Sequence, residues 1–338
     1  MAIQKDKLGI IGVGNPIVDS ITHIDPSFLN TIEGEPGGMV LVDTETLQSI
    51  LTRVPSKITQ APGGSAGNAL FALARMGANA QFIGKTGNCQ DGEFYRNTFT
   101  HLGGNPRSFK TGSQPNGHCL SLVTPDGQRT MRTDLGAAMT LHPDEISPAD
   151  FEGCDLAHIE GFLFFNEALI QKVLASAHTA GCKISLDLAS FEVVNAAGEK
   201  LPELLEKYVD YVFANEQEAA AFTKIESDYS LMAQKLNNYC ELAAVKAGPG
   251  GSYITNGGPV EVIPAIHVPY VVDTTGAGDL WAAGFLYGLS HHCELRTCGH
   301  LGSLLGAAAV ETLGAYLSEP TWNKLLPRIS ELIGQSVH

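Results

Sequence analysis

The residues best suited to chemistry lie between positions 273 and 279, where two glycines precede an aspartate. The string reads Asp-Thr-Thr-Gly-Ala-Gly-Asp, and an apolar run follows it at 280–286. Gly276 and Gly278 permit a tight turn with exposed N–H groups, and a buried helix beginning at about Asp279 would point the positive end of its dipole at that turn. Such a turn suits the charge on a transferring phosphoryl group, and the Asp279 carboxylate can accept a proton from an alcohol. An isolated Gly-x-Gly-Asp more often marks a carboxylate that only complements a helix dipole, whereas the whole seven-residue string before a buried helix is much more specific.

Other polar and glycine-rich segments follow predicted strands. The small residues of 62–69 (PGGSAGNA) let the backbone approach a polyhydroxy ligand, and Asn68 offers both a donor and an acceptor. After the first predicted strand, Asp19 can accept two hydrogen bonds from a vicinal diol. Asn215 and Glu218 have the spacing of a helix capping box, which is the simpler interpretation of that pair taken alone.

These segments together resemble the PfkB, or ribokinase-like, family of carbohydrate kinases. Residues 273–279 are similar to the family's C-terminal signature, and residues 62–69, with the helix and strand predicted after them, look like its N-terminal signature. Matching segments run from about residue 9 to residue 318. The resemblance implies that Asp279 is the catalytic base and that the amides of Gly276, Ala277 and Gly278 form an anion hole.

The resemblance also implies roles in substrate binding. Gly64 and Asn68 match substrate-binding positions of the family. Residues 14–19 are similar to a segment of the adenosine-kinase-like branch, whose aspartate binds two neighbouring ribose hydroxyls; this implies the same role for Asp19, with Asn15 as a weaker partner. We therefore expect transfer of the ATP γ-phosphoryl group to a primary hydroxyl of an adenosine-like nucleoside or a small sugar.

For ATP and Mg²⁺, the resemblance points to the second half of the chain. Residues 215–218 resemble an Asn-x-x-Glu motif that organises magnesium, which implies that Asn215 and Glu218 hold Mg²⁺ through water molecules. Residues 245–252 look like the nucleotide-side loop, although the family often has Thr or Ser where this chain has a lysine. The implied nucleotide-binding residues are Asn215, Lys246, Gly248, Gly251 and Thr275. In several members Asp273, Thr275 and the 308–315 region surround a monovalent cation, which implies a potassium site.

Short apolar runs alternate with helical patterns along most of the chain. Strands buried on both faces are predicted at 8–13, 81–83, 156–159, 184–186, 211–214 and 243–245, and helices at 66–76, 91–102, 167–180, 201–207, 216–223 and 229–239. This alternation predicts an α/β fold with a mostly parallel sheet covered by helices. The resemblance implies the ribokinase-like form of that fold, three-layer α/β/α, in a single domain over 1–338.

Two segments break the alternation and predict a small β-sheet lid. Residues 16–45 contain strand-like pieces between glycines and prolines, and residues 117–134 fit a hairpin around Pro125-Asp126-Gly127. We expect a lid over the active site from about 16–45 and 110–135. Arg129 or Arg132, on the second hairpin strand, is either a cation over the phosphates or a solvated surface group.

Composition excludes several classes of partner. The net charge of −15 disfavours nucleic acid and anionic membranes. No apolar stretch approaches the ~18 residues of a membrane span, and the run at 8–13 is too short for a signal core. The seven cysteines form no CxxC pair, which predicts buried thiols in a reducing compartment. We expect a cytoplasmic monomer or homodimer that acts on a small molecule.

Three alternatives remain beside the main hypothesis. A ribose- or fructose-type sugar kinase would use the same motifs. Gly63-Gly64-Ser65-Ala66-Gly67 fits the nucleophile elbow of α/β serine hydrolases, but the residues before it (57–62) make a poor buried strand, and no motif selects the Asp and His partners. A non-catalytic ligand-binding protein on the same scaffold would be expected to lack the base, and Asp279 is present.

Overall fold

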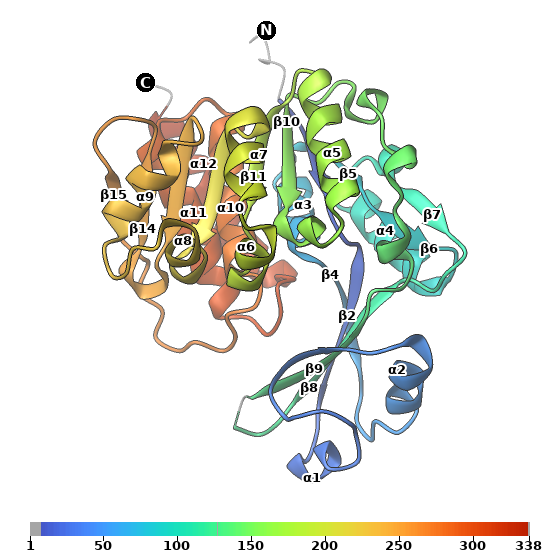
Figure 1. Ribbon diagram of the computed structural model, residues 1–338. Coiled ribbons are helices and arrows are strands. Elements are labelled where there is room, and N and C mark those ends of the chain that lie inside the picture. Colours follow the sequence, from blue (N-terminus) through green and yellow to red (C-terminus); the bar gives the residue numbers. More distant parts are fainter. Residues whose placement is uncertain (1–7, 127, 337–338) are drawn as a thin grey trace, which may run out of the picture.

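The computed structural model describes residues 8–126 and 128–336, and its larger part is an eight-stranded sheet between two layers of helices (Figure 1). The strand order is β15-β14-β13-β12-β11-β10-β1-β5. The strands from β5 to β13 in this order pair in parallel, whereas β14 pairs antiparallel with both of its neighbours, β13 and β15. The bounds are β1 Gly9–Val13, β5 Asn79–Ile83, β10 Leu156–Glu160, β11 Lys183–Asp187, β12 Tyr211–Asn215, β13 Leu242–Lys246, β14 Ser252–Thr255 and β15 Glu261–Ile263.

Each face of this sheet has its own hydrophobic core. Successive side chains of a strand point to opposite faces, so Ile10 packs into one core and Ile11 into the other. One layer contains α3 (Ser65–Arg75), α4 (Gln90–His101), α10 (Ala277–Ser290), α11 (Leu295–Val310) and α12 (Glu319–Ser336). The other contains α5 (Glu167–Thr179), α6 (Phe191–Ala197), α7 (Lys200–Tyr208), α8 (Glu216–Thr223) and α9 (Tyr229–Asn237). Burial on both faces explains why the parallel strands appear in the sequence as continuous apolar runs.

A second, five-stranded sheet projects from the body together with two short helices (Figure 1). Its order is β3-β9-β8-β2-β4, and Leu120 and Leu122 pack beneath α2 in a separate small core. The elements are β2 (Ile17–His23), α1 (Pro26–Leu29), β3 (Gly38–Leu41), α2 (Thr44–Leu51), β4 (Thr59–Gly63), β8 (Gly117–Val123) and β9 (Arg129–Asp134). A two-stranded ribbon of β6 (Lys85–Gly87) and β7 (Lys110–Gly112) lies beside α4.

Most predicted elements are present. The six predicted parallel strands and six predicted helices all form, and β8 and β9 pair as an antiparallel hairpin; Gly127 of its turn lies outside the described residues. The residues before Ser65, which make a poor buried strand, form β4, an edge strand antiparallel to β2. Its first residues are exposed, which is why no apolar run marked it. Within the described residues, none of the helices combines the length and hydropathy needed to cross a bilayer.

Candidate active site

One cleft, of about 1420 Å³, lies between the carboxyl ends of the large sheet and the small sheet. Asn15 and Asp19 line its small-sheet side, and Asp187, Asn215 and Lys246 line it from the ends of β11, β12 and β13. Ligands of open α/β sheets bind beyond the carboxyl ends of the strands, which is where these side chains are found. The volume exceeds the ~1,000 Å³ upper range of single small-ligand pockets, so two ligands fit side by side.

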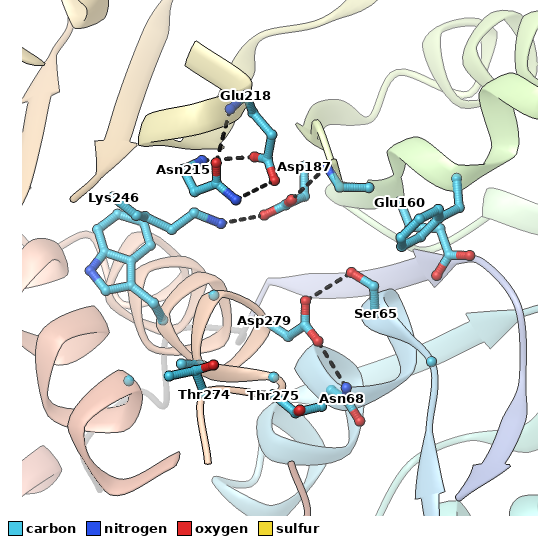
Figure 2. Close-up of a pocket in the computed structure, with 18 of the residues that line it drawn as sticks. Ser65, Asn68, Glu160, Asp187, Asn215, Glu218, Lys246, Thr274, Thr275 and Asp279 are labelled. Atoms are coloured by element: carbon cyan, nitrogen blue, oxygen red, sulfur yellow. Dashed lines mark hydrogen bonds and ion pairs between the residues drawn. The ribbon is translucent and has the colours of Figure 1, made fainter. Parts of the chain in front are cut away.

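Asp279 stands at the start of α10, inside this cleft. The helix is preceded by Gly276, whose φ is +73°, and a Cβ added there would lie 2.2 Å from the Cβ of Ala315, so only glycine fits. Oδ1 of Asp279 accepts a hydrogen bond from Oγ of Ser65 at 2.8 Å, and Oδ2 accepts one from Nδ2 of Asn68 at 2.8 Å (Figure 2). Both donors belong to the first turn or so of α3, so the starts of two helices fix this carboxylate.

Two backbone amides in the first turn of α10, those of Gly278 and Asp279, lack an acceptor among the described residues. Ala277 N donates to Thr274 O at 3.2 Å, whereas the amides of Gly278 and Asp279 have no acceptor within the part of the chain that the structure describes. Unpaired amides at a helix start carry the positive end of the helix dipole. The helix was predicted to begin at about Asp279. It begins at Ala277, which makes Asp279 the third helical residue.

The electrostatics of Asp279 follow from its surroundings. Burial raises the pKa of Asp279 to about 6, the hydrogen bonds from Asn68 and Ser65 lower it, Asp187 raises it and Lys246 lowers it. The carboxylate is therefore mostly ionised at neutral pH but remains a better proton acceptor than an ordinary aspartate.

Asp19, on β2, and Gly64, directly after β4, also line the cleft. Gly64 has φ +84°, and a Cβ there would lie 2.1 Å from Asn15 O. Within the described residues, no hydrogen-bond donor contacts the Asp19 carboxylate. Burial raises the pKa of Asp19 to about 7, and the nearby charges of Arg129 and His118 lower it. A half-buried carboxylate that lines a cleft and has no donor among the described residues is available to a ligand's hydroxyl groups.

Glu160, which was not predicted from the sequence, connects the segments at 14–19 and 62–69. It is the last residue of β10 and is 1% exposed. Oε1 accepts the Asn15 amide N–H at 2.9 Å as well as Nδ2 of Asn15, and Oε2 accepts the Ala66 amide at 3.1 Å. Burial raises the pKa of Glu160 to about 7. The available signal was an ionisable residue that ends an apolar strand.

Asn215 and Glu218 form the capping box that their spacing predicts. Oδ1 of Asn215 accepts the amides of Gln217 and Glu218 at 2.9 Å each, and Oε2 of Glu218 accepts the Asn215 amide at 2.7 Å. Burial raises the pKa of Glu218 to about 7, with a further rise from Asp187. Within the described residues, no group of three or more His, Cys, Asp or Glu could hold a metal ion. Both residues line the cleft.

The lysine and glycines of the 245–252 segment also line the cleft. Nζ of Lys246 lies 2.6 Å from Oδ2 of Asp187, and both side chains are largely buried. Gly248 and Gly251 have φ values of +51° and +86°, and a Cβ on Gly251 would lie 2.1 Å from Ile263 O. Asp187 was not among the residues selected from the sequence, and it too ends an apolar strand.

Asp273 gives no support to a potassium site, because its carboxylate is fully engaged. Oδ1 accepts the amide and hydroxyl of Thr275, and Oδ2 accepts the Gly314 amide at 2.7 Å and an ion pair from Arg129. Arg129 thus joins the small sheet to the turn at Thr275. Arg132 is 0% exposed, so it is not a solvated surface group; its guanidinium donates to the Glu33 and Gly34 carbonyls and does not line the cleft.

Comparisons with known proteins agree with this geometry. A model of the pfkB family of carbohydrate kinases matches residues 40–322. The structure of a probable sugar kinase from Rhizobium etli is 29% identical with a TM-score of 0.84, over 96% of this chain and 99% of that one. The adenosine kinase structure from Sinorhizobium meliloti is 31% identical with a TM-score of 0.82, over 95% and 99%. Adenosine kinase 2 of Arabidopsis thaliana is 24% identical over 96% of this chain and all of that protein.

The chain belongs to the PfkB family of carbohydrate kinases, in its adenosine-kinase-like branch, and has the ribokinase-like fold. It is therefore a phosphotransferase that acts on a hydroxyl group of a sugar or nucleoside, which replaces the hydrolase and non-catalytic alternatives. Consistent with this, Oγ of Ser65 donates to Asp279 instead of pairing with a histidine. Kinases of this family use ATP and Mg²⁺.

Proposed function

We propose that this chain transfers the γ-phosphoryl group of ATP to the primary hydroxyl of a nucleoside, with Asp279 as the base. The observation that carries the proposal is the position of Asp279. Its carboxylate lies in the cleft at the start of α10, where two amides lack an acceptor among the described residues, and the Asp19 carboxylate, which no donor contacts within those residues, lines the same cleft. Transfer of a phosphoryl group to an alcohol needs a proton acceptor, a site of positive potential and an acceptor for the substrate's hydroxyl groups.

Each side chain has a distinct part in this proposal. Asp19 accepts hydrogen bonds from two sugar hydroxyls, Asn15 and Gly64 shape that end of the cleft, and Asn68 contacts both Asp279 and the substrate. Asp279 takes the proton of the primary hydroxyl, a contribution of about 10²–10⁴-fold for a well-placed base. The free amides stabilise charge on the transferred group, whose precise positioning supplies much of the remaining rate.

ATP is proposed to occupy the other end of the cleft, along Lys246, Gly248, Gly251 and Thr275, with Asn215 and Glu218 organising Mg²⁺ through water. When bound, Mg²⁺ neutralises charge on the phosphate oxygens. The small sheet is proposed to act as a lid that excludes water, since its strands form one wall of the cleft.

A nucleoside is favoured over a free sugar by the apolar side chains on the wall of the cleft. Met39, Leu41, Met139 and Phe165 line it and are 54%, 57%, 66% and 66% exposed. Large exposed apolar groups in a concave site commonly mark a ligand contact, and a nucleobase needs an apolar slot that ribose or fructose does not. The relatives named adenosine kinases also favour a nucleoside, whereas the Rhizobium etli relative, a probable sugar kinase, favours the alternative of a free sugar.

A coupled assay of ADP release, run on one panel of nucleosides and sugars, tests the proposal. We expect the highest kcat/KM with adenosine or a related nucleoside. A higher kcat/KM with ribose or fructose would establish the sugar-kinase alternative. ADP release that no acceptor stimulates above the background ATPase would contradict the proposal as a whole.

A further inference from the structure

Lys246 is unusual because of the charges around it. Among the described residues that line the cleft it is the only lysine or arginine. The carboxylates that line the same cleft belong to Asp19, Glu160, Glu167, Asp187, Glu216, Glu218 and Asp279. A cleft that must receive a polyphosphate therefore has a single cationic side chain of this kind, and its placement decides where that charge can act.

The side chain of Lys246 reaches between two features of the site. From the end of β13 it extends past β12 to Asp187 at the end of β11, where Nζ and Oδ2 are 2.6 Å apart (Figure 2). The two side chains are only 12% and 7% exposed. On its other side, Nζ lies 3.1 Å from where a Cβ on Gly278 would be, so the ammonium rests against the first turn of α10.

This placement brings like charges together. The start of α10 carries the positive end of the helix dipole, and a cation there is unfavourable by itself. The Gly278 and Asp279 amides are also unpaired within the described part of the chain. Asp187 offsets the ammonium while no anion is bound. An ammonium beside a helix start whose amides lack acceptors among the described residues is the combination of groups that binds phosphate.

We propose that Lys246 contacts the phosphoryl group that is transferred, together with the Gly278 and Asp279 amides, and that Asp187 is a positioning residue that holds the lysine. The inference rests on the proposed function. Gly278 directly precedes the base, so the anion beside it is the group next to the accepting hydroxyl. In that step a bond forms between the acceptor oxygen and the γ-phosphorus, the bond to ADP breaks, and the hydroxyl proton passes to Asp279.

The test compares Lys246→Met with Lys183→Met. Lys183 is a matched control because its Nζ lies 2.7 Å from Asp210 at the opposite end of β11, outside the cleft. Calorimetric titration gives Kd for ADP and for the β,γ-imido analogue of ATP, both with Mg²⁺. Loss of one charge-assisted contact should weaken the imido analogue by about 10–100-fold and lower kcat similarly. ADP, which lacks the transferred group, should weaken by less than about threefold, and the control should change neither.

The outcomes separate cleanly. Equal weakening of ADP and the imido analogue would overturn the assignment to the transferred phosphate, and unchanged affinity for both would reduce Lys246 to a structural ion pair. If Lys246→Met does not fold because Asp187 is left buried without a cation, the double variant Asp187→Asn/Lys246→Met carries the same test. A wild-type enzyme that phosphorylates neither nucleosides nor sugars refutes the proposed function, whereas unchanged binding by the variant in an active enzyme refutes only this inference.

Discussion

Removal of the Ser65 hydroxyl should shift the pH dependence of catalysis. Ser65→Ala deletes one of the two side-chain hydrogen bonds to Asp279, the one from Oγ to Oδ1 at 2.8 Å. It leaves the backbone turn intact, since the residue that caps α3 is Gly64. A hydrogen bond to a charged group contributes about 1.5–3 kcal/mol, and we take about 1 kcal/mol because the carboxylate partly faces the cleft. At 1.36 kcal/mol per pKa unit, the pKa of Asp279 rises by about 0.7.

The assay is kcat at saturating nucleoside and ATP between about pH 5 and pH 9, because kcat/KM would also report Asp19, a proposed nucleoside-binding carboxyl whose pKa burial raises to about 7. Asp279 acts as a base, so activity requires its ionised form; the wild-type profile should fall below pH about 6, in line with the pKa of that carboxyl. In Ser65→Ala the fall should begin at a pH about 0.7 higher, with near-wild-type rates above pH ~8. Ser330→Ala, which removes an exposed hydroxyl that donates to Leu326 O, is the matched control. A loss that is uniform across pH, or an acidic limb that stays in place, would refute this reasoning.

Two further predictions concern buried carboxylates. Burial raises the folded-state pKa of Asp279 from 3.8 to about 6. The free energy of unfolding of the wild type should therefore fall by about 1–2 kcal/mol relative to that of Asp279→Asn as pH rises from about 4 to about 6. Urea unfolding at pH 4.5 and pH 8 measures this change, and a difference between the two proteins that does not vary with pH would contradict it. Glu160→Gln replaces one acceptor oxygen with an NH₂ group that faces the Asn15 or Ala66 amide. In steady-state kinetics, KM for the nucleoside should therefore rise about tenfold while KM for ATP stays within about twofold. An equal rise in both KM values would show that Glu160 only stabilises the fold.

The parts of the molecule that follow from local patterns were predictable from the sequence. The parallel strands are buried on both faces, so they appear as apolar runs, and Gly276 marks the turn that precedes a buried helix. The spacing of Asn215 and Glu218 specifies their capping box, because both partners lie within one helical turn. Short-range signals of this kind need no knowledge of the tertiary structure.

Other features depend on contacts between distant segments. Ser65 and Asp279 are far apart in the sequence, and only the packing of α3 against α10 brings them together. Glu160 and Asp187 each end an apolar strand, but their place in the site depends on the strand order, which no local pattern gives. For Arg132 neither a contact with the phosphates nor surface solvation was correct, because its guanidinium donates to backbone carbonyls of a distant segment, and side-chain composition carries no signal for such partners.

Turnover of Asp279→Asn, measured as ADP release with a nucleoside acceptor, tests the central claim most directly. We expect kcat to fall by at least about 10²–10⁴-fold with the fold preserved and the nucleoside affinity within a few-fold of wild type, since the substitution removes the proton acceptor but not the cleft. Turnover near the wild-type rate in this variant would contradict the assignment of the base and the function proposed from it.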